Sequence, residues 1–408
     1  MSRAAPMSVP VAPTALARLA LLLGLVLMAM GQTLLFALFG PLGRDMGLSE
    51  IMVGGVISLA AVAVFLTSPW WGRRSDLRGR RPVFLFAMAG LGLTTLGFTL
   101  MLEAGRAGWV MGIWAFVLLT LARVIYGLSV TGAQPAAAGW IADTTTPEER
   151  TGGMAMIGAA YGVGAILGPV LAWMLSGFGL LVPLYAIGVM ALAIFILAWR
   201  ALPETRVSTP DAAPILSPFD PRLRLELGTL VIVFLVISSL QQTLAFYVQD
   251  TGGLDIVATV ARVGQALALL ALVMFATQVV VALRKPSPKR ILRVGLIFGA
   301  GGTALLLGWP EQPGILLSHA ILGFGMGLVI PGLQGLASLA VDAEEQGAVA
   351  GFVAAAMAGG FVLGPVLGTG LYGLWQGLPY LLAITLLLLC AALHLRRMRP
   401  EGSGKAPA

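Results

Sequence analysis

Residues 168–171 read Gly-Pro-Val-Leu, and residues 364–367 read Gly-Pro-Val-Leu again. The two copies lie 196 residues apart. Working outward, the same offset superposes further residues of special type: Gly127 on Gly323, Pro135 on Pro331, Gly139 on Gly335, Glu148 and Glu149 on Glu344 and Glu345, and Gly164 on Gly360. Prolines and glutamates that keep one register with glycines indicate an internal repeat, not a chance agreement of common residues.

The composition indicates what surrounds the two copies. The chain of 408 residues is 58% hydrophobic and 11% charged, with a mean hydropathy of +0.93. A soluble domain carries roughly 25% charged residues, so most of this outer surface must face lipid. A membrane-spanning helix needs about 20 apolar residues. Twelve runs meet that length: 17–40, 51–71, 83–103, 109–137, 153–176, 179–199, 227–249, 256–283, 292–309, 313–338, 347–371 and 378–395.

These runs are divided six and six by a polar stretch rich in Pro, Asp and Arg. Six spans separate the repeat copies, so the two halves share one orientation, as in transporters with parallel repeats. The sequence therefore predicts an all-α membrane protein of twelve transmembrane helices in two pseudo-symmetric six-helix halves. We expect an N-terminal bundle, a cytoplasmic linker, a C-terminal bundle and a cytoplasmic tail at 1–200, 201–226, 227–396 and 397–408.

The positive residues fix the orientation. With the N-terminus inside, all but four of the 25 lysines and arginines fall in inner segments; the exceptions are Arg44, Arg106, Arg123 and Arg262. This bias places both termini in the cytoplasm, and we expect a multi-pass protein of the cell inner membrane. The net charge of +7 lies in short loops between apolar runs, which argues for topology signals and against a nucleic-acid partner.

Soft metal ligands are scarce. The chain holds two histidines and one cysteine, Cys390, which lies in an apolar run, so it predicts no intramolecular disulfide, no metal site and no cofactor. No clustered His, Asp, Ser or Cys site lies within the spans. A membrane-embedded enzyme therefore remains a distant alternative, which two carboxylates or a metal at one depth would revive.

The loop after the second span reads Gly72-Arg-Arg-Ser-Asp76-Leu-Arg-Gly79-Arg80-Arg81. It resembles the pattern G-x-L-A-D-R-x-G-R-K of the major facilitator superfamily, and within it the twelve-span drug:proton antiporters; Arg74 and Leu77 depart from the pattern. The eleventh span begins on this side, and its positive dipole end favours an anion such as Asp76. The resemblance implies a charge lock that stabilises the outward-facing state, formed by Gly72, Asp76, Gly79, Arg80, Arg81 and Asp143. The alternative is a topology signal alone.

Two further spans carry the same resemblance. Residues 119–132 resemble the superfamily motif centred on an intramembrane arginine, here Arg123, whose depth makes it a functional candidate; a structural arginine at a helix kink is the alternative. The fifth span resembles the antiporter motif, which is associated with exporters, although Ala172 and Trp173 replace its final glycines. This helix-bend motif and its repeat comprise Gly164, Gly168, Pro169, Gly360, Gly364 and Pro365. Its small residues permit close helix packing. The alternative interpretation is that they serve packing alone and say nothing about the direction of transport.

No Asp or Glu lies well inside a span, whereas exporters of cations keep a buried carboxylate because an uncompensated buried charge is costly. Glu226, Asp250 and Asp255 lie at span borders. His319 occupies the repeat position of Arg123, so we expect it to titrate near neutral pH and carry a coupled proton; a neutral, hydrogen-bonded histidine is the alternative. Further residues of the substrate or proton pathway are Gln32, Tyr126, Gln241, Gln242 and Tyr247, with Tyr161, Phe246, Gln265 and Gln278 as additional candidates.

The sequence thus predicts a secondary active transporter that exports a small organic solute by alternating access in exchange for protons. The missing acids favour a neutral, zwitterionic or anionic solute. We expect a non-enzymatic monomer whose partners are the solute, protons and the lipid bilayer. A proton-coupled uptake symporter is the alternative of the same class.

Overall fold

The computed structural model describes residues 14–204, 216–217, 219–342 and 345–397. Part of the predicted linker and all but the first residue of the predicted tail lie outside these ranges, as does Glu344 of the repeat. The described helices are α1 (Ala15–Asp45), α2 (Glu50–Arg78), α3 (Arg80–Arg106), α4 (Gly112–Val130), α5 (Ala133–Thr144), α6 (Pro147–Leu175), η1 (Ser176–Phe178), α7 (Val182–Ala201), α8 (Arg224–Gly252), α9 (Ile256–Arg284), α10 (Pro288–Gly308), α11 (Gln312–Leu339), α12 (Gln346–Leu374) and α13 (Leu378–Arg397).

The prediction of twelve spans is confirmed, because twelve stretches of the described helices are long and apolar enough to cross a membrane. Most extend several residues beyond the predicted runs, since a helix continues through its polar ends after the apolar stretch is over. The fourth span runs from Gly112 to Thr144 and is formed by α4 and α5 together. The seventh and eighth spans are separated by a short break at residues 253–255, where Gly253 is left-handed (φ +57°) and the Asp255 side chain caps α9.

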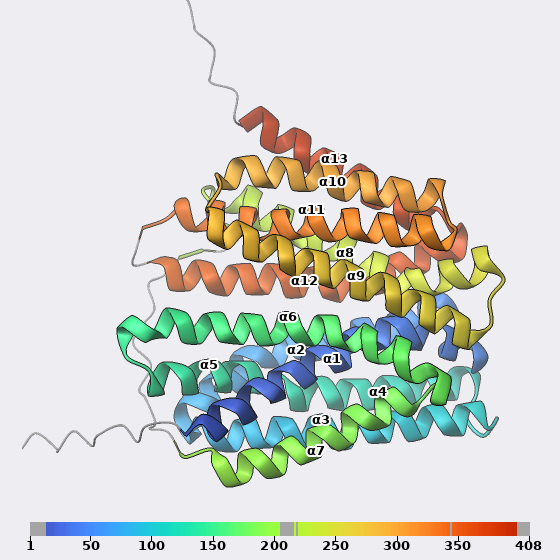
Figure 1. The fold of residues 1–408 in the computed structure, drawn as a ribbon, viewed down its shortest axis with the longest axis horizontal. Coiled ribbons are helices and arrows are strands. Elements are labelled where there is room, and N and C mark those ends of the chain that lie inside the picture. Colours follow the sequence, from blue (N-terminus) through green and yellow to red (C-terminus); the bar gives the residue numbers. More distant parts are fainter. Residues whose placement is uncertain (1–13, 205–215, 218, 343–344, 398–408) are drawn as a thin grey trace, which may run out of the picture.

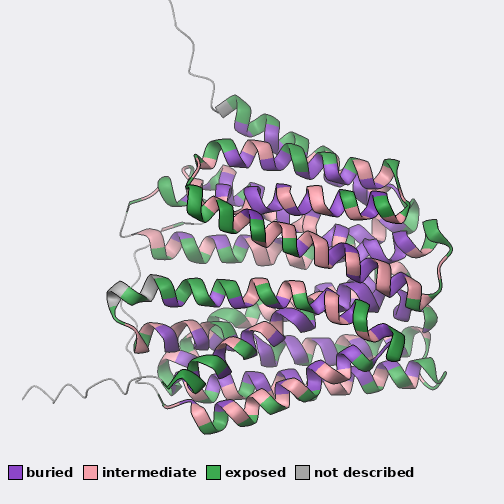
Figure 2. Cartoon of the chain, in the orientation of Figure 1, coloured by how far each residue is buried: buried purple, intermediate pink, exposed green. Residues whose placement is uncertain are grey.

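The helices form two side-by-side bundles, α1–α7 (the first half) and α8–α13 (the second half), as Figure 1 shows. The start of α1 and the end of α13 lie at the same end of the molecule, which we call the terminal side; the other end is the opposite side. Large apolar side chains on the outer faces are exposed, among them Leu66, Leu93 and Trp114, whereas buried residues concentrate between the helices (Figure 2). An exposed apolar surface of this extent requires lipid, so the chain is a multi-pass membrane protein.

The internal repeat has a packing basis. A Cβ atom on Gly164 or Gly168 would collide with the backbone of α1, at Val26 and Met30 respectively. In the second half, a Cβ atom on Gly360 or Gly364 would collide with the backbone of α8 in the same way. The repeated glycines therefore permit α6 to lie against α1 and α12 to lie against α8 at equivalent places in the two halves.

The two halves meet on the opposite side. Gly54 of α2 lies against the Pro365 carbonyl of α12, and Gly264 of α9 lies against the Pro169 carbonyl of α6. The Val366 amide of α12 also donates to the Ser58 hydroxyl of α2 over 3.1 Å. Both helix-bend motifs thus take part in the contact between the halves.

The connection between the halves is fixed where it enters α8. The Arg222 guanidinium bonds to Glu345, before α12, over 2.9 Å and to Asp220 over 3.0 Å. These hydrogen bonds hold the pKa of the Asp220 and Glu345 carboxyls below their usual values. The end of the connection is thereby attached to the second half.

Candidate transport site

A cavity of about 610 Å³ lies between the two halves. It is bounded by α1, α5 and α6 from the first half and by α8, α9, α10, α11 and α12 from the second, so each half supplies part of its wall. Most of its lining is apolar. The polar lining residues are Gln32, Thr33, Gln134, Tyr161, Gln241, Gln278, His319 and Gln334.

Five glutamines dominate the polar part of this wall, and no Asp, Glu, Lys or Arg is among its described lining residues. A glutamine amide both donates and accepts hydrogen bonds without a net charge. Apolar surface with a few convergent polar groups is the usual character of a small-molecule site. The cavity is therefore suited to an organic molecule with both apolar surface and hydrogen-bonding groups.

Arg123 lines a second lobe of about 310 Å³, which shares Gln32, Gln134 and Tyr161 with the main cavity. Only 7% of Arg123 is exposed, and its Cζ lies 4.0 Å from the centre of the Tyr126 ring. Its Nε has no hydrogen-bond partner, and no carboxylate among the described residues forms an ion pair with it. The lobe thus presents a buried cation whose partial compensation comes from an aromatic face.

His319 faces the main cavity from α11 and is 4% exposed. Its Nδ1 lies 2.8 Å from the Ile315 carbonyl oxygen, and since a carbonyl can only accept, Nδ1 must carry a hydrogen. This bond leaves Nε2 as the ring nitrogen available to the cavity.

The cavity continues toward the terminal side. A further space of about 500 Å³ shares Gln134, Gln334 and Met357 with it and reaches Ser338 and Gln346 at the ends of α11 and α12. The close contacts between the halves described above all lie on the opposite side. The structure is therefore closed on the opposite side and open toward the terminal side.

The residues of the predicted charge lock come together within the first half. Arg80, at the start of α3, bonds to Asp76 of α2 and, through Nε, to Asp143 of α5 over 3.2 Å. Its guanidinium crosses Gly139, where a Cβ atom would overlap it. Arg81 donates to the Trp199 carbonyl of α7 over 2.7 Å.

The segment predicted as a loop is helical up to Arg78, because α2 continues through it and only Gly79 separates α2 from α3. Its two glycines differ in their roles. Gly79 links α2 to α3 with φ +95°, a conformation that requires glycine, whereas a Cβ atom on Gly72 would meet nothing within 4 Å. The expected proximity of Asp76 to the start of α12 is not seen in this conformation. The described bonds of Asp76 stay within the first half, because the halves are apart on the terminal side.

Several predicted pathway residues lie elsewhere. Gln242 is completely buried, does not line the cavity, and both polar atoms of its side chain lack partners. Tyr247 donates to the Leu306 carbonyl over 3.2 Å, and its ring packs against Tyr380 at a tilt of 51°. Gln265 bonds to Gln312 over 2.9 Å, and Phe246 packs beneath Arg44 on the opposite side. An unbroken apolar helix gave no signal of which face would point inward.

Sequence reasoning missed Gln134 and Gln334. Both are polar residues within otherwise apolar spans, one residue from Pro135 and three from Pro331 respectively. Attention to every uncharged polar residue beside the repeated prolines could have found them. For metals, no group of three or more His, Cys, Asp or Glu side chains occurs within the ranges the structure describes.

Twelve membrane-spanning helices around a cavity between two related halves define a membrane transporter. The family model of the Major Facilitator Superfamily matches residues 21–352 and 285–408. The tetracycline resistance protein class G of Vibrio anguillarum is 33% identical over 386 residues, covering 89% of this chain and 93% of the relative. The class C protein of Escherichia coli is 28% identical over 384 residues, covering 89% and 92%.

Among solved structures, the human organic anion transporter MFSD10 (TETRAN) superposes with a TM-score of 0.66 at 22% identity, covering 93% of this chain and 99% of that one. The chain belongs to the Major Facilitator Superfamily. The expected resemblance to the twelve-span drug antiporters is confirmed, and the chain is a transporter, not an enzyme.

Proposed function

We propose that this protein exports a small neutral, zwitterionic or anionic organic solute from the cytoplasm by alternating access, in exchange for protons. The observation that carries the proposal is the cavity of about 610 Å³, which is rich in glutamine, has no acidic residue in its described lining and opens toward the terminal side. The arginine and lysine distribution supports a cytoplasmic position for that side. A solute would then load from the cytoplasm, as an exporter of the inner membrane requires. The chain acts as a monomer, since one chain supplies the whole cavity.

The charge of the solute follows from Arg123. A buried guanidinium without a carboxylate partner is costly, and an anionic group on the solute would compensate it through charge-assisted hydrogen bonds. An organic cation would find no carboxylate in the described lining of either lobe. The anionic group would occupy the lobe of Arg123, and the rest of the solute would lie against the glutamines and apolar side chains of the main cavity.

The relatives support export. The relatives from Vibrio anguillarum and Escherichia coli are tetracycline resistance proteins by name, which argues for an organic solute of comparable complexity. Proton exchange is proposed because His319 faces the cavity with one ring nitrogen free of backbone bonding.

A transport screen on inverted membrane vesicles tests the proposal. Solutes are supplied in matched sets that differ in charge but not in size, with and without an imposed pH gradient, and vesicles lacking the protein are the control. We expect accumulation of an anionic or zwitterionic member that collapses when the gradient is dissipated. Accumulation only in right-side-out vesicles would identify uptake instead. Preference for the cationic member would contradict the assignment of charge.

A further inference from the structure

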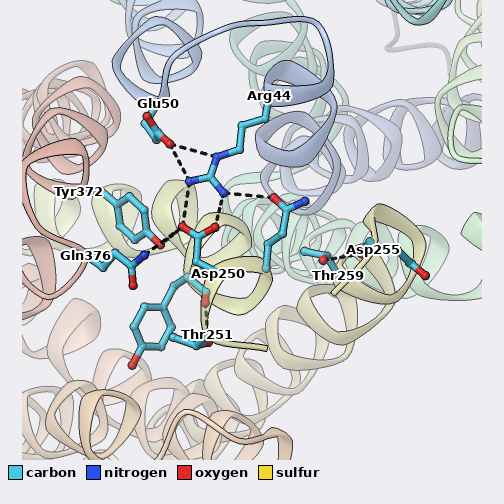
Figure 3. Close-up of polar contacts among 10 residues, drawn as sticks. Arg44, Glu50, Asp250, Thr251, Asp255, Thr259, Tyr372 and Gln376 are labelled. Carbon is cyan, nitrogen blue, oxygen red and sulfur yellow. Dashed lines mark hydrogen bonds and ion pairs between the residues drawn. The ribbon is translucent and has the colours of Figure 1, made fainter. Parts of the chain in front are cut away.

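Six polar residues are linked by hydrogen bonds where the two halves close on the opposite side, and Figure 3 labels all of them except Gln249. We call them the outer ion cluster: Arg44, Glu50, Gln249, Asp250, Tyr372 and Gln376. Arg44, in the last turn of α1, forms two parallel bonds with Asp250, near the end of α8: Nη1 to Oδ1 over 2.6 Å and Nη2 to Oδ2 over 2.9 Å. This ion pair joins the first half to the second.

No other ion pair among the described residues joins the two halves. The pairs of Arg80, Arg81 and Arg106 stay within the first half and its connecting segment. Those of Arg222 stay at the second half. Arg44 Nη1 also donates to Gln249 Oε1 of α8 over 3.3 Å, and its guanidinium lies over the Phe246 ring. The remaining described contacts across the closed side include apolar packing and one backbone-to-serine hydrogen bond. Among the described ion pairs, Arg44–Asp250 is therefore the one that connects the two halves.

The same guanidinium also binds a carboxylate of its own half. Glu50, at the start of α2, accepts from Arg44 Nη2 over 2.6 Å and from Arg44 Nε over 3.1 Å, both at Oε1. One cation is thus shared between two carboxylates, one from each half. If the halves separate, Arg44 retains Glu50.

Asp250 likewise has partners in its own half. The Tyr372 hydroxyl donates to its Oδ2 over 2.7 Å, and Gln376 Nε2 lies 3.4 Å from the same oxygen. The Phe246 ring lies 4.5 Å below the Arg44 Cζ. The side chains of Arg44, Glu50 and Asp250 are only about a quarter exposed, at 23%, 26% and 24%. A bidentate arginine–carboxylate pair with this shielding is stronger than an exposed one.

We propose that the Arg44–Asp250 pair is the bond that keeps the opposite side closed, and that Glu50 retains Arg44 when this side opens. Breaking a shielded pair is costly when a charge is left alone. Here separation leaves Arg44 with Glu50, and Asp250 with two hydrogen-bond donors, so the closed state is favoured yet the halves can part reversibly. These residues position the halves in the transport cycle and do not contact the cavity. The inference rests on the alternating access proposed above.

Glu50 gives the proposal a distinctive consequence. Removing the charge of Asp250 or Arg44 should favour opening, because the bond between the halves is lost. Removing the charge of Glu50 should not, because Asp250 then holds Arg44 alone. Opening would instead leave Arg44 without a carboxylate, so turnover should slow while the resting protein stays closed. If only the total surface charge mattered, neutralising Glu50 and neutralising Asp250 would have the same effect.

The test is a distance measurement on purified protein in lipid nanodiscs, without solute or gradient. Spin labels are placed at Trp109→Cys in the first half and Glu311→Cys in the second, two exposed positions on the opposite side, with Cys390→Ala removing the native thiol. The variants are Asp250→Asn, Arg44→Gln, their double variant and Glu50→Gln. Asp45→Asn is the matched control, because its partner Arg106 is in the same half.

For Asp250→Asn and for Arg44→Gln we expect the ratio of long to short distances to rise about tenfold, the ratio that corresponds to about 1.4 kcal/mol. The double variant should add little to either single one, and Glu50→Gln and Asp45→Asn should keep the short distance. An unchanged distribution in both Asp250→Asn and Arg44→Gln would overturn the proposal, as would a long distance in Glu50→Gln. Because the measurement needs no solute, such a result would leave the export assay, and with it the proposed function, to stand or fall separately.

Discussion

The Cζ atom of Arg123 lies 4.0 Å from the centre of the Tyr126 ring, at the wall of a lobe continuous with the main cavity. The Phe98 ring adds a second aromatic contact, with its centre 5.7 Å away. Aromatic faces compensate a buried cation only in part. The uncompensated part of the free energy of burying this charge favours binding of an anionic group in the lobe. The preference for the charge of the solute therefore depends on the Arg123 side chain.

Arg123→Ala should therefore abolish accumulation of an anionic solute, and its binding should weaken about 10- to 100-fold, the loss expected for charged hydrogen bonds. Arg123→Lys should bind poorly as well, because an ammonium lacks the planar fork of donors. The measurement is solute binding to purified protein, followed by transport in inverted vesicles. Full activity of the lysine variant would show that solute binding requires a positive charge at position 123 but not the guanidinium geometry. Full activity of the alanine variant would show that Arg123 has a structural role and does not bind the solute.

Tyr126→Phe is the matched control for Arg123. It keeps the ring face below the guanidinium and removes only the hydroxyl, so solute binding should change less than threefold. A loss as large as that of Arg123→Ala would instead assign the anion contact to the tyrosine hydroxyl.

Asp76→Asn should strongly reduce transport while leaving the protein in the membrane. The substitution removes one of the two carboxylates that hold the buried Arg80, and it leaves Asp143 as the remaining one. Transport and membrane content are measured together, with Arg78→Gln, an exposed position of the same loop, as the control. Full transport by Asp76→Asn at normal expression would leave Asp76 as an ordinary loop residue.

The lock should reach the second half only when the terminal side closes. Cysteines at Leu77, next to Asp76, and at Gly347, in the first turn of α12, should then cross-link in a Cys390→Ala background, although the described bonds of Asp76 do not extend to α12 in the present conformation. The expected signal is a cross-link that increases when Asp250→Asn opens the opposite side. Equal cross-linking with and without Asp250→Asn would show that the contact between the lock and α12 does not depend on the motion of the halves.

The fold was predictable from the sequence for two reasons. The length of each apolar run indicates a helix that crosses the lipid bilayer, and the repeated residues indicate equivalent helix contacts in the two halves. The repeated Gly164 and Gly360 mark close approaches between helices, and Arg123 is recognisable in the sequence as a charged residue within an apolar span. The cavity wall was only partly predictable, because a helix surrounded by other helices carries similar apolar residues on all its faces. The sequence therefore does not show that Gln241 faces the cavity while the neighbouring Gln242 does not. The outer ion cluster was missed because its members come from three stretches of chain that are far apart in the sequence, and a border position such as Asp250 does not show which residue it will contact.

Two neighbouring glycines of α12 allow a matched test of helix packing. A Cβ atom on Gly360 would lie 2.6 Å from the Leu235 amide nitrogen, whereas one on Gly359 would meet nothing within 4 Å. Gly360→Ala should cost about 1–3 kcal/mol through overpacking, and Gly359→Ala should be neutral or gain up to about 1 kcal/mol in helix propensity. Buried Cys390, the chain's one cysteine, reports unfolding through a thiol-reactive dye in a thermal melt. Equal melting of the two variants would show that α12 and α8 are not in close contact there.

His319 is the group that we expect to carry the coupled proton. It faces the cavity with Nε2, while Nδ1 is held by the Ile315 carbonyl over 2.8 Å. A proton on Nε2 would occupy the ring nitrogen that could otherwise accept a hydrogen bond from the solute. Proton and solute therefore compete for one place, and binding of the solute should release the proton. His319→Gln keeps a polar side chain but has no ring nitrogen that can take up a proton. Accumulation against a gradient should therefore be lost, whereas downhill exchange of the solute should survive because the cavity remains.

The decisive measurement is solute-induced proton release from detergent-purified protein, compared among His319→Gln, Asp76→Asn, Asp250→Asn and Asp255→Asn. We expect the loss of release in the histidine variant alone. The carboxylates lie at the ends of the spans, where Asp76 is bound by Arg80, Asp250 by Arg44, and Asp255 caps α9. They can therefore alter the rate of opening without altering how many protons accompany each solute. Unchanged release from His319→Gln, together with its loss in one carboxylate variant, would move the coupling site to that carboxylate. Because a gating defect slows release but preserves its stoichiometry, the ratio of protons to solute separates a coupling residue from a gating one.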